Sequence, residues 1–213
     1  MARLRKGRAE AGGEVRRRLL AGAAELFSNK GYAATTVREI VARAGVTKPA
    51  LYYYFGSKEG IYLDLMREPI QGFFENIASA MDEAGTARER LVRLCLLAYD
   101  DFVRHLSLAR LMYSIYYGPP QGAPFIDFDA LQLRFQDAVL GILRKGIRAG
   151  EFRRGNPTDM MWAVIGAANV AMEAELCRPG QRVGREGLRR MLGVVFRGIA
   201  AGPDRAAGRG DGR

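Results

Sequence analysis

The stretch TVREIVARAGVTKPALYYYFGSK, residues 36–58, decides the fold of this 213-residue chain. Thr36, followed three residues later by Glu39, forms a capping box that predicts a helix start, and Gly45 supplies the backbone at which short helices end. Thr47 predicts the cap of a second helix, which tolerates a proline in its first turn because the amides there have no helical partner. Two short helices joined by a tight glycine-containing turn predict a helix-turn-helix, whose second helix enters the major groove of DNA.

A longer run around that stretch resembles a known family. FSNKGYAATTVREIVARAGVTKPALYYYFGSKEGIYLDLM, residues 27–66, is similar to the DNA-binding signature of the TetR family of bacterial transcriptional regulators, and the resemblance extends back to about Val15. The residues that carry it stand at fixed spacing: Phe27, Gly31-Tyr32, Thr35-Thr36, Ile40-Val41, Ala44-Gly45-Val46, Leu51-Tyr52, Phe55 and Lys58. The resemblance implies an all-α fold with an N-terminal three-helix head and a larger helical effector-binding and dimerisation domain.

Charge is placed unevenly along the chain. The formal net charge is +10; residues 1–60 hold twelve Lys/Arg against five Asp/Glu, and residues 61–213 hold twenty-one against eighteen. A basic excess on the part that carries the helix-turn-helix is typical of a module that faces phosphate. An Arg-rich proteome would raise the charge everywhere, and it does not explain this asymmetry.

Helical periodicity and turn residues divide the chain into four segments. We expect a disordered basic arm over residues 1–13, a DNA-binding domain over 14–62, a helical ligand-binding and dimerisation domain over 63–201 and a disordered tail over 202–213. The basic side chains of the arm either enter the minor groove or stay solvated. A helix from Ser57 to about Glu83, bent by Pro69, connects the two domains. The other expected helices cover 14–28, 36–44, 48–55, 88–106, 107–117, 125–150, 157–177 and 185–201, about nine in total with the connecting one.

Outward residues of the second helix are the predicted DNA contacts. Lys48 can donate to guanine or to a phosphate, and only the first carries sequence information. The resemblance implies that Tyr52 faces the DNA backbone and that Thr36 and Lys58 are phosphate positions; Thr36 is also a plain helix cap. The predicted set is Thr36, Lys48, Pro49, Ala50, Tyr52, Tyr53, Tyr54 and Lys58. The alternative for one of the three tyrosines is a place in the core.

The resemblance also implies a small-molecule effector in the larger domain. The predicted lining is apolar with one amide: Tyr99, Phe102, Met112, Tyr116, Phe135, Trp162, Asn169 and Met172. Trp162 and Asn169 lie two turns apart on one helix, and a buried amide among apolar side chains suits the orientation of a ligand. The alternative for each residue is an ordinary core position, since aromatic residues and Met at helical spacing usually pack.

A homodimer is the expected assembly. Small residues recur along 157–177, where Ala163, Gly166 and Ala167 permit the close approach of another helix. With the last helix they predict a four-helix bundle across a two-fold axis, as the dimers of this family form. The alternative is that both helices cover only the core of their own chain.

Enzyme chemistry has no visible basis in this sequence. One histidine, two separated cysteines and the lack of a phosphate-binding loop predict no catalytic residue, no metal site and no cofactor. Cysteines outside any disulfide pattern and no apolar run long enough for a bilayer predict a cytoplasmic protein without a membrane partner.

We therefore expect a sequence-specific regulator that binds a double-stranded DNA operator. The expected form is a repressor that a small, largely apolar effector releases from a palindromic site. A basic architectural DNA-binding protein without an effector is the alternative, and the roughly 140 residues beyond the head argue against it.

Overall fold

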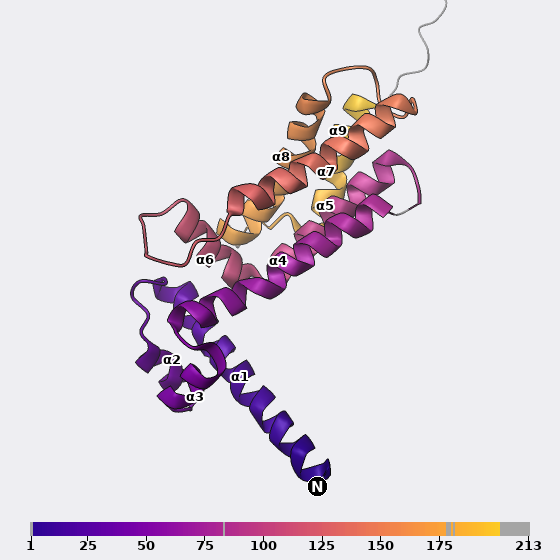
Figure 1. The fold of residues 1–213 in the computed structure, drawn as a ribbon. Helices are drawn as coiled ribbons and strands as arrows, with labels where there is room; N and C mark the ends of the chain where they lie inside the picture. The colour runs from indigo at the N-terminus through magenta and orange to yellow at the C-terminus, as the bar shows by residue number, and fades with distance from the viewer. Residues whose placement is uncertain (1, 83, 178–179, 181, 201–213) are drawn as a thin grey trace, which may run out of the picture. The chain divides into compact units, whose positions relative to one another are not determined.

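The computed structural model describes residues 2–82, 84–177, 180 and 182–200, and over these residues the predicted all-α fold is confirmed (Figure 1). The helices are α1 (Ala2–Lys30), α2 (Val37–Ala44), α3 (Lys48–Phe55), α4 (Lys58–Asp82), α5 (Ala87–Arg104), α6 (Leu106–Tyr116), α7 (Phe128–Arg148), α8 (Pro157–Cys177) and α9 (Gly184–Ile199). The described part contains no strand, although Phe152 and Ala200 form an isolated antiparallel bridge. The tail predicted over 202–213 lies outside the described residues.

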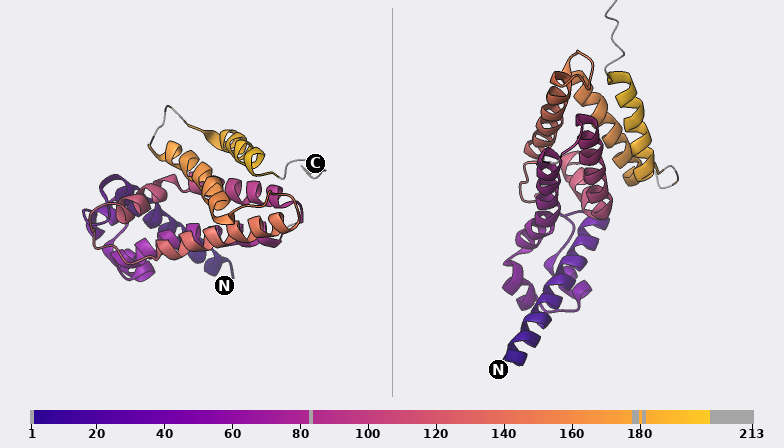
Figure 2. Two further views of the ribbon diagram at one scale, coloured as in Figure 1. Left: turned by 90° about the horizontal axis from the view of Figure 1, so that it is seen from above. Right: turned by 90° about the vertical axis from the view of Figure 1, so that its right-hand side faces the viewer.

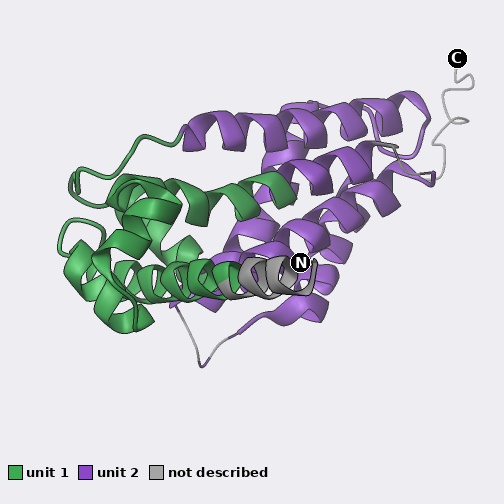
Figure 3. Cartoon of the chain, turned by 60° about the horizontal axis from the view of Figure 1, so that its bottom comes forward, with its two compact units in different colours: residues 1–72, 105–126 green, residues 73–104, 127–213 purple. Residues whose placement is uncertain are grey.

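The chain divides into two compact units, and the division falls inside α4 (Figure 3). Unit 1 comprises residues 1–72 and 105–126, and unit 2 comprises residues 73–104 and 127–213. Unit 1 thus holds the helix-turn-helix together with α6 and the segment that follows it. The sequence predicted one domain boundary, at residue 62, and therefore did not place α6 with the helix-turn-helix. The physical reason is that Leu108 and Leu111 of α6 are buried in the same apolar core as α1, α2 and α3.

The core of unit 1 follows from helical apolar spacing. Leu19, Ala23 and Phe27 recur every fourth residue along α1 and are fully buried. They pack against Ile40 of α2 and Leu51 of α3. Helices α1, α2 and α3 thereby share one hydrophobic core, and this core determines which of their faces are exposed to solvent.

The core of unit 2 is formed by α5, α7, α8 and α9, with the second half of α4 packed against it. α8 lies beside α9 in both views of Figure 2, and Val164 and Ile165 of α8 share the core with Leu192 and Phe196 of α9. Gly146 of α7 permits close approach, since a Cβ there would lie within 2.5–2.7 Å of the Phe152 ring and the Ala87 Cβ.

Helix boundaries differ from the sequence predictions most clearly at the N-terminus. α1 begins at Ala2 and not near Glu14, so the segment predicted as a disordered arm is helical from Ala2 onward. Residues 2–13 contain no proline, and their Ala, Arg, Leu, Lys and Glu residues favour the helix more than the three glycines disfavour it. α4 continues as a helix through Pro69.

One further expectation changes in unit 2. Among the described residues α8 alone is long and apolar enough to cross a bilayer, which corrects the expectation that the chain has no such run. Half of that stretch is buried inside the protein, and a buried core helix passes the same test, so α8 is weak support for a membrane span. Both cysteines are free thiols; Cys95 is buried, and Cys177 is exposed.

Candidate nucleic-acid interface

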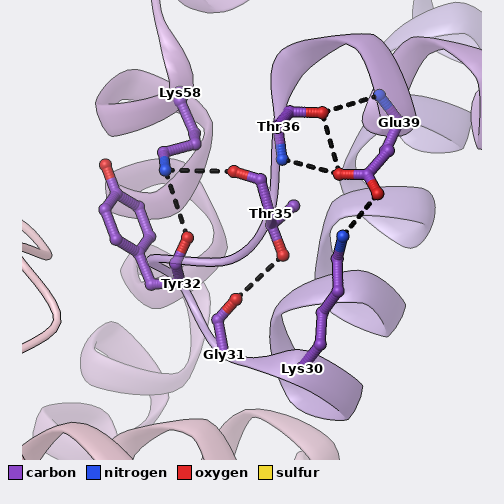
Figure 4. Close-up of polar contacts among 7 residues, drawn as sticks. All are labelled: Lys30, Gly31, Tyr32, Thr35, Thr36, Glu39 and Lys58. Atoms are coloured by element: carbon purple, nitrogen blue, oxygen red, sulfur yellow. Dashed lines mark hydrogen bonds and ion pairs between the residues drawn. The ribbon is translucent and has the colours of Figure 1, made fainter.

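The capping box predicted at the start of α2 is confirmed (Figure 4). The Thr36 amide donates to Glu39 Oε2 at 2.9 Å, and the Glu39 amide donates to Thr36 Oγ1 at 3.3 Å. Lys30 Nζ donates to the other carboxylate oxygen of Glu39 at 2.5 Å. This ammonium group, followed by the bonds from Thr36, lowers the pKa of Glu39 from 4.5 to about 2. A fixed negative charge therefore lies at the N-terminus of α2, where the helix dipole favours it.

Lys58 holds the turn between α1 and α2 (Figure 4). Its Nζ donates to the carbonyl oxygens of Tyr32 at 3.1 Å and Thr35 at 3.0 Å, and it lies 4.1 Å from the centroid of the Tyr32 ring. An ammonium group has three hydrogens, so one donor remains for a phosphate. The residue predicted as a phosphate contact thus also has a structural role that the sequence did not reveal.

Gln121, in the segment after α6, also holds the turn between α1 and α2. The Tyr32 amide donates to Gln121 Oε1 at 2.9 Å, while Gln121 Nε2 donates to the Ser114 carbonyl oxygen at 3.2 Å. Burial, followed by the Glu59 carboxylate, raises the pKa of Tyr32 to about 12, so this ring stays neutral. No sequence signal connects Gln121 to a turn 89 residues earlier, and only the folded chain shows the contact.

α3 is a short helix in which Leu51 is the buried residue. The Tyr53 ring is 81% exposed and the Tyr52 ring 51% exposed. Tyr54 is half-buried against the core of unit 1, which is the alternative that the sequence left open for one tyrosine. Of the other predicted contacts on α3, Lys48 and Pro49 are exposed and Ala50 is half-buried. The exposed members therefore share one side of the helix, opposite Leu51.

Cationic side chains of residues 12–60 fall into two groups. Most have internal partners: Arg16 with Asp64, Arg17 with Glu14, Lys30 with Glu39, Arg43 with Glu25, and Arg18 and Lys58 with backbone carbonyls. Arg38 and Lys48 are exposed and have no partner among the described residues. Arg38 is absent from the predicted set of DNA contacts. Its place in the first turn of α2, two residues after the Thr36 cap, could have indicated an exposed cation near the helix N-terminus.

Comparison with known proteins identifies this head. Residues 19–65 match the family model described as bacterial regulatory proteins, tetR family. The repressor KstR2 of Rhodococcus jostii is 29% identical over 202 residues, which cover 87% of this chain and 91% of KstR2. The chain belongs to the TetR family. It is a DNA-binding transcriptional regulator and not an enzyme.

Two further TetR-family proteins are similar. The transcriptional activator FasR of Mycolicibacterium smegmatis is 37% identical over 92 residues, which cover 43% of this chain and 42% of FasR. The structure of the ketosteroid transcriptional regulator KstR2 of Mycobacterium tuberculosis has a TM-score of 0.68 at 25% identity and covers 87% of this chain. The similarity to KstR2 therefore spans both units, whereas the similarity to FasR covers less than half of either chain.

The effector residues predicted for this TetR-family chain are divided between the units. Met112 and Tyr116 belong to unit 1, where Met112 packs against the head core and Tyr116 is exposed. They lie in unit 1 because α6 packs with α1, and their role as effector contacts stays a prediction. In unit 2, Phe135 is buried, and Met172 is half-buried against the same core.

Three residues of unit 2 lie differently from the prediction. Asn169 is exposed and Trp162 is half-exposed, so the buried amide expected on α8 is wrong. The opposite face of α8 carries the core residues and turns these two side chains outward. Tyr99 is buried, but its hydroxyl donates to Glu175 at 2.7 Å. Burial and that carboxylate raise the pKa of Tyr99, and the bond connects α5 to the end of α8.

The remaining predicted lining residue, Phe102, is half-buried on α5. Over the described residues no group of three or more His, Cys, Asp or Glu side chains could hold a metal ion.

Proposed function

We propose that this chain is a homodimeric repressor that binds a palindromic operator through α3 and is released by a small, largely apolar effector. One observation carries the proposal. Of the cationic side chains described between residues 12 and 60, Arg38 and Lys48 alone are without an internal partner. Both are exposed, and Lys48 shares α3 with the exposed rings of Tyr52 and Tyr53. Cations without partners beside exposed tyrosines match what a phosphate-rich groove requires.

Each predicted contact receives a role from its place in unit 1. Lys48, in the first turn of α3, donates to a base edge or a phosphate, and Arg38 donates to a phosphate near the start of α2. Tyr52 and Tyr53 donate their hydroxyls to phosphate and pack their rings on thymine methyl groups. Lys58 uses its one remaining hydrogen for a phosphate. Thr36 positions α2 through its capping box, while Pro49 and Ala50 allow close approach of the backbone.

Dimerisation is assigned to the exposed face of α8 and α9. Val170 of α8 is 53% exposed, and Val194 of α9 is 61% exposed. Ala163 is exposed on the same helix as Val170, whereas Ala168 and Ala171 are buried in the core of their own chain. The buried alanines thus pack in their own chain, and Ala163 remains available for the proposed interface. Apolar side chains exposed on two adjacent helices suit the isologous interface of a two-fold dimer.

The effector is assigned to unit 2. The Phe73 ring lies 6.0 Å from the Phe135 ring, and the Arg134 guanidinium lies 4.8 Å from the centroid of Phe74. An aromatic cluster with one adjacent cation suits an apolar molecule that carries a polar end. The ketosteroid regulator KstR2 supports an apolar effector class, since its similarity to this chain spans both units. α4 contributes residues to both units, so a molecule that favours one arrangement of its second half can shift DNA binding.

We propose repression and not activation because the chain aligns with more of a repressor than of an activator. The alignment with the repressor KstR2 covers 91% of that protein, whereas the alignment with the activator FasR covers 42% of it. An architectural DNA-binding protein remains the competing function. It would bind DNA without sequence preference and without an effector.

The first experiment is a selection of random duplexes with the full-length protein, followed by sedimentation of the complex. We expect one enriched palindrome with half-sites about 34–36 Å apart, bound by two protomers. Enrichment of no sequence would support the architectural alternative. Specific binding by one protomer would refute the dimer.

The second experiment tests release. Apolar compounds that raise the unfolding midpoint are titrated against the protein with and without the selected duplex. We expect a bound effector to weaken operator affinity by about 5–150-fold, and the duplex to weaken effector binding by the same factor. A compound that binds unit 2 without any such coupling would contradict the release mechanism.

A further inference from the structure

Three consecutive arginines of α1, Arg16, Arg17 and Arg18, have different partners in unit 1. Arg17 pairs with Glu14, one turn earlier on its own helix. Arg18 instead reaches the end of α2, just before α3, the helix assigned to DNA, and Arg16 reaches the last residue of α3.

Arg18 caps the end of α2, directly before α3. Gly45 adopts the left-handed conformation with φ 62°, and its amide donates to the Ala42 carbonyl oxygen at 3.2 Å. A helix end of this kind satisfies the earlier carbonyls and leaves the last ones without helical donors. The Arg18 guanidinium donates to the carbonyl oxygens of Ala44 and, at 3.0 Å, Gly45. One side chain of α1 therefore supplies the donors that the turn of the helix-turn-helix lacks.

Neighbouring residues on the same face of α1 support this contact. Gly22, one turn after Arg18, is buried, and a Cβ there would lie 3.3 Å from the Arg43 side chain. Glu25, one turn further, accepts two hydrogen bonds from Arg43 at 2.8 and 2.7 Å. Residues 18, 22 and 25 thus form one stripe that holds the C-terminal end of α2.

Arg16 acts at the opposite end of α3. Its guanidinium carbon lies 5.5 Å from the centroid of the Phe55 ring, and Phe55 is the last residue of α3. The same guanidinium pairs with Asp64 of α4 at 2.6 Å. Arg16 therefore connects α1, the end of α3 and the start of α4.

α3 has few anchors of its own. Leu51 is its buried residue, and the Thr47 side chain makes no capping hydrogen bond with the described residues. We propose that Arg18, through the turn before α3, and Arg16, at the last residue of α3, are positioning residues that hold α3 in the orientation required for operator binding, without contacting DNA themselves. This inference rests on the proposed function, because it concerns the same interface.

Arg17 provides a matched control for the test. Arg16→Met, Arg17→Met and Arg18→Met remove one charge each from adjacent positions and keep an apolar stem of similar length. The probe is the duplex selected by the wild-type protein, together with a duplex of unrelated sequence. Affinities are measured well below the unfolding midpoint of every variant, so that a loss of stability alone does not change them.

We expect Arg18→Met and Arg16→Met to weaken binding of the selected duplex by about tenfold, the size of a lost hydrogen-bonded cap. Binding of the unrelated duplex should match that of Arg17→Met, which keeps near wild-type affinity for both. The dependence of log affinity on log salt should be the same for all three variants. A direct phosphate contact would instead lower that slope by about 0.9 per protomer for the variant that lost it.

Two outcomes overturn the inference. If Arg18→Met and Arg16→Met bind the selected duplex as Arg17→Met does, the orientation of α3 does not depend on them. If their salt slope falls while that of Arg17→Met does not, they contact phosphate directly. Failure of the proposed function looks different, because the wild-type protein would then select no sequence at all.

Discussion

α3 and α8 are held in place by different forces. α3 has one buried residue among eight; one arginine of α1 contacts the ring of its last residue, and another caps the turn that precedes it. α8 buries ten of its twenty-one residues, almost all apolar, and presents Val170 on its outer face. The position of α3 therefore depends on side chains outside it, whereas that of α8 depends on the burial of its own apolar side chains.

This difference has a practical consequence for mutagenesis. Apolar burial contributes about 25 cal/mol per Å², so truncation inside α8 acts on the stability of unit 2. A lost hydrogen bond near α3 costs only about 1 kcal/mol, yet it can rotate a helix that has to fit a groove. Stability and DNA affinity should respond to different sets of substitutions.

The largest effect is expected at the outer face of α8. Val170→Asp places a carboxylate in the proposed dimer interface, with Glu173 one turn away as a like charge. A desolvated charge without a partner costs several kcal/mol, so the dimer should dissociate at least 100-fold more readily by sedimentation. Val103→Asp, an exposed position on α5, is the control and should leave the dimer unchanged. Equal assembly of both variants would contradict the assigned face.

The next largest effect is expected inside α8. Val164→Ala removes buried methyl groups from the core of unit 2 and should lower the free energy of unfolding in urea by about 2 kcal/mol. Val103→Ala makes the same chemical change at an exposed position and should cost less than about 0.5 kcal/mol. Similar losses for both would show that unit 2 is not the cooperative core described above.

Lys48 tests the DNA side of α3. Lys48→Ala should change preference at particular base pairs by about 1–3 kcal/mol in a randomised operator library. Arg17→Ala removes an exposed charge that is already paired with Glu14, and it should leave the preferences unchanged. If wild type and Lys48→Ala select the same base preferences from the library, Lys48 does not take part in base recognition.

Lys58 tests the division between phosphate contact and turn structure. Lys58→Ala should weaken binding to all sequences alike and lower the salt slope by about 0.9 per protomer. It should also lower the free energy of unfolding, because two carbonyl oxygens lose their donor. A stability loss with an unchanged salt slope would leave Lys58 only its structural role.

The smallest effect concerns Glu39 and acid. Because its pKa is lowered from 4.5 to about 2, its contribution to stability is fully present above pH 4.5 and is lost as the pH falls towards 2. The difference in unfolding free energy between wild type and Glu39→Gln should therefore shrink as the pH falls through that range. A difference that stays constant down to pH 2 would contradict the ion pair with Lys30.

Much of the fold could be predicted because its signals are local. The capping box at Thr36, the stop at Gly45 and the apolar spacing of α1 all depend on residues within a few turns. The place of α6 could not be predicted in this way. Leu108 and Leu111 have ordinary helical spacing, and nothing local indicates which core they enter.

The same limit applies to the site. Exposure of Lys48 and Tyr53 follows from the position of Leu51 on a short helix, whereas the partner of Lys58 depends on a turn formed by Tyr32 and Thr35. Asn169 was misplaced because the apolar and small residues of α8 surround the whole helix, so its sequence does not show which face is buried.

Hydrogen exchange with and without the selected duplex tests the central claim most directly, namely that α3 and the start of α2 meet DNA. The account predicts that the duplex slows exchange at the amides of residues 36–39, 47–48 and 50–53. Exchange at the buried positions around Val164 should not change. Protection confined to unit 2, or to the segment after α6, would contradict the assignment of α3 as the recognition helix.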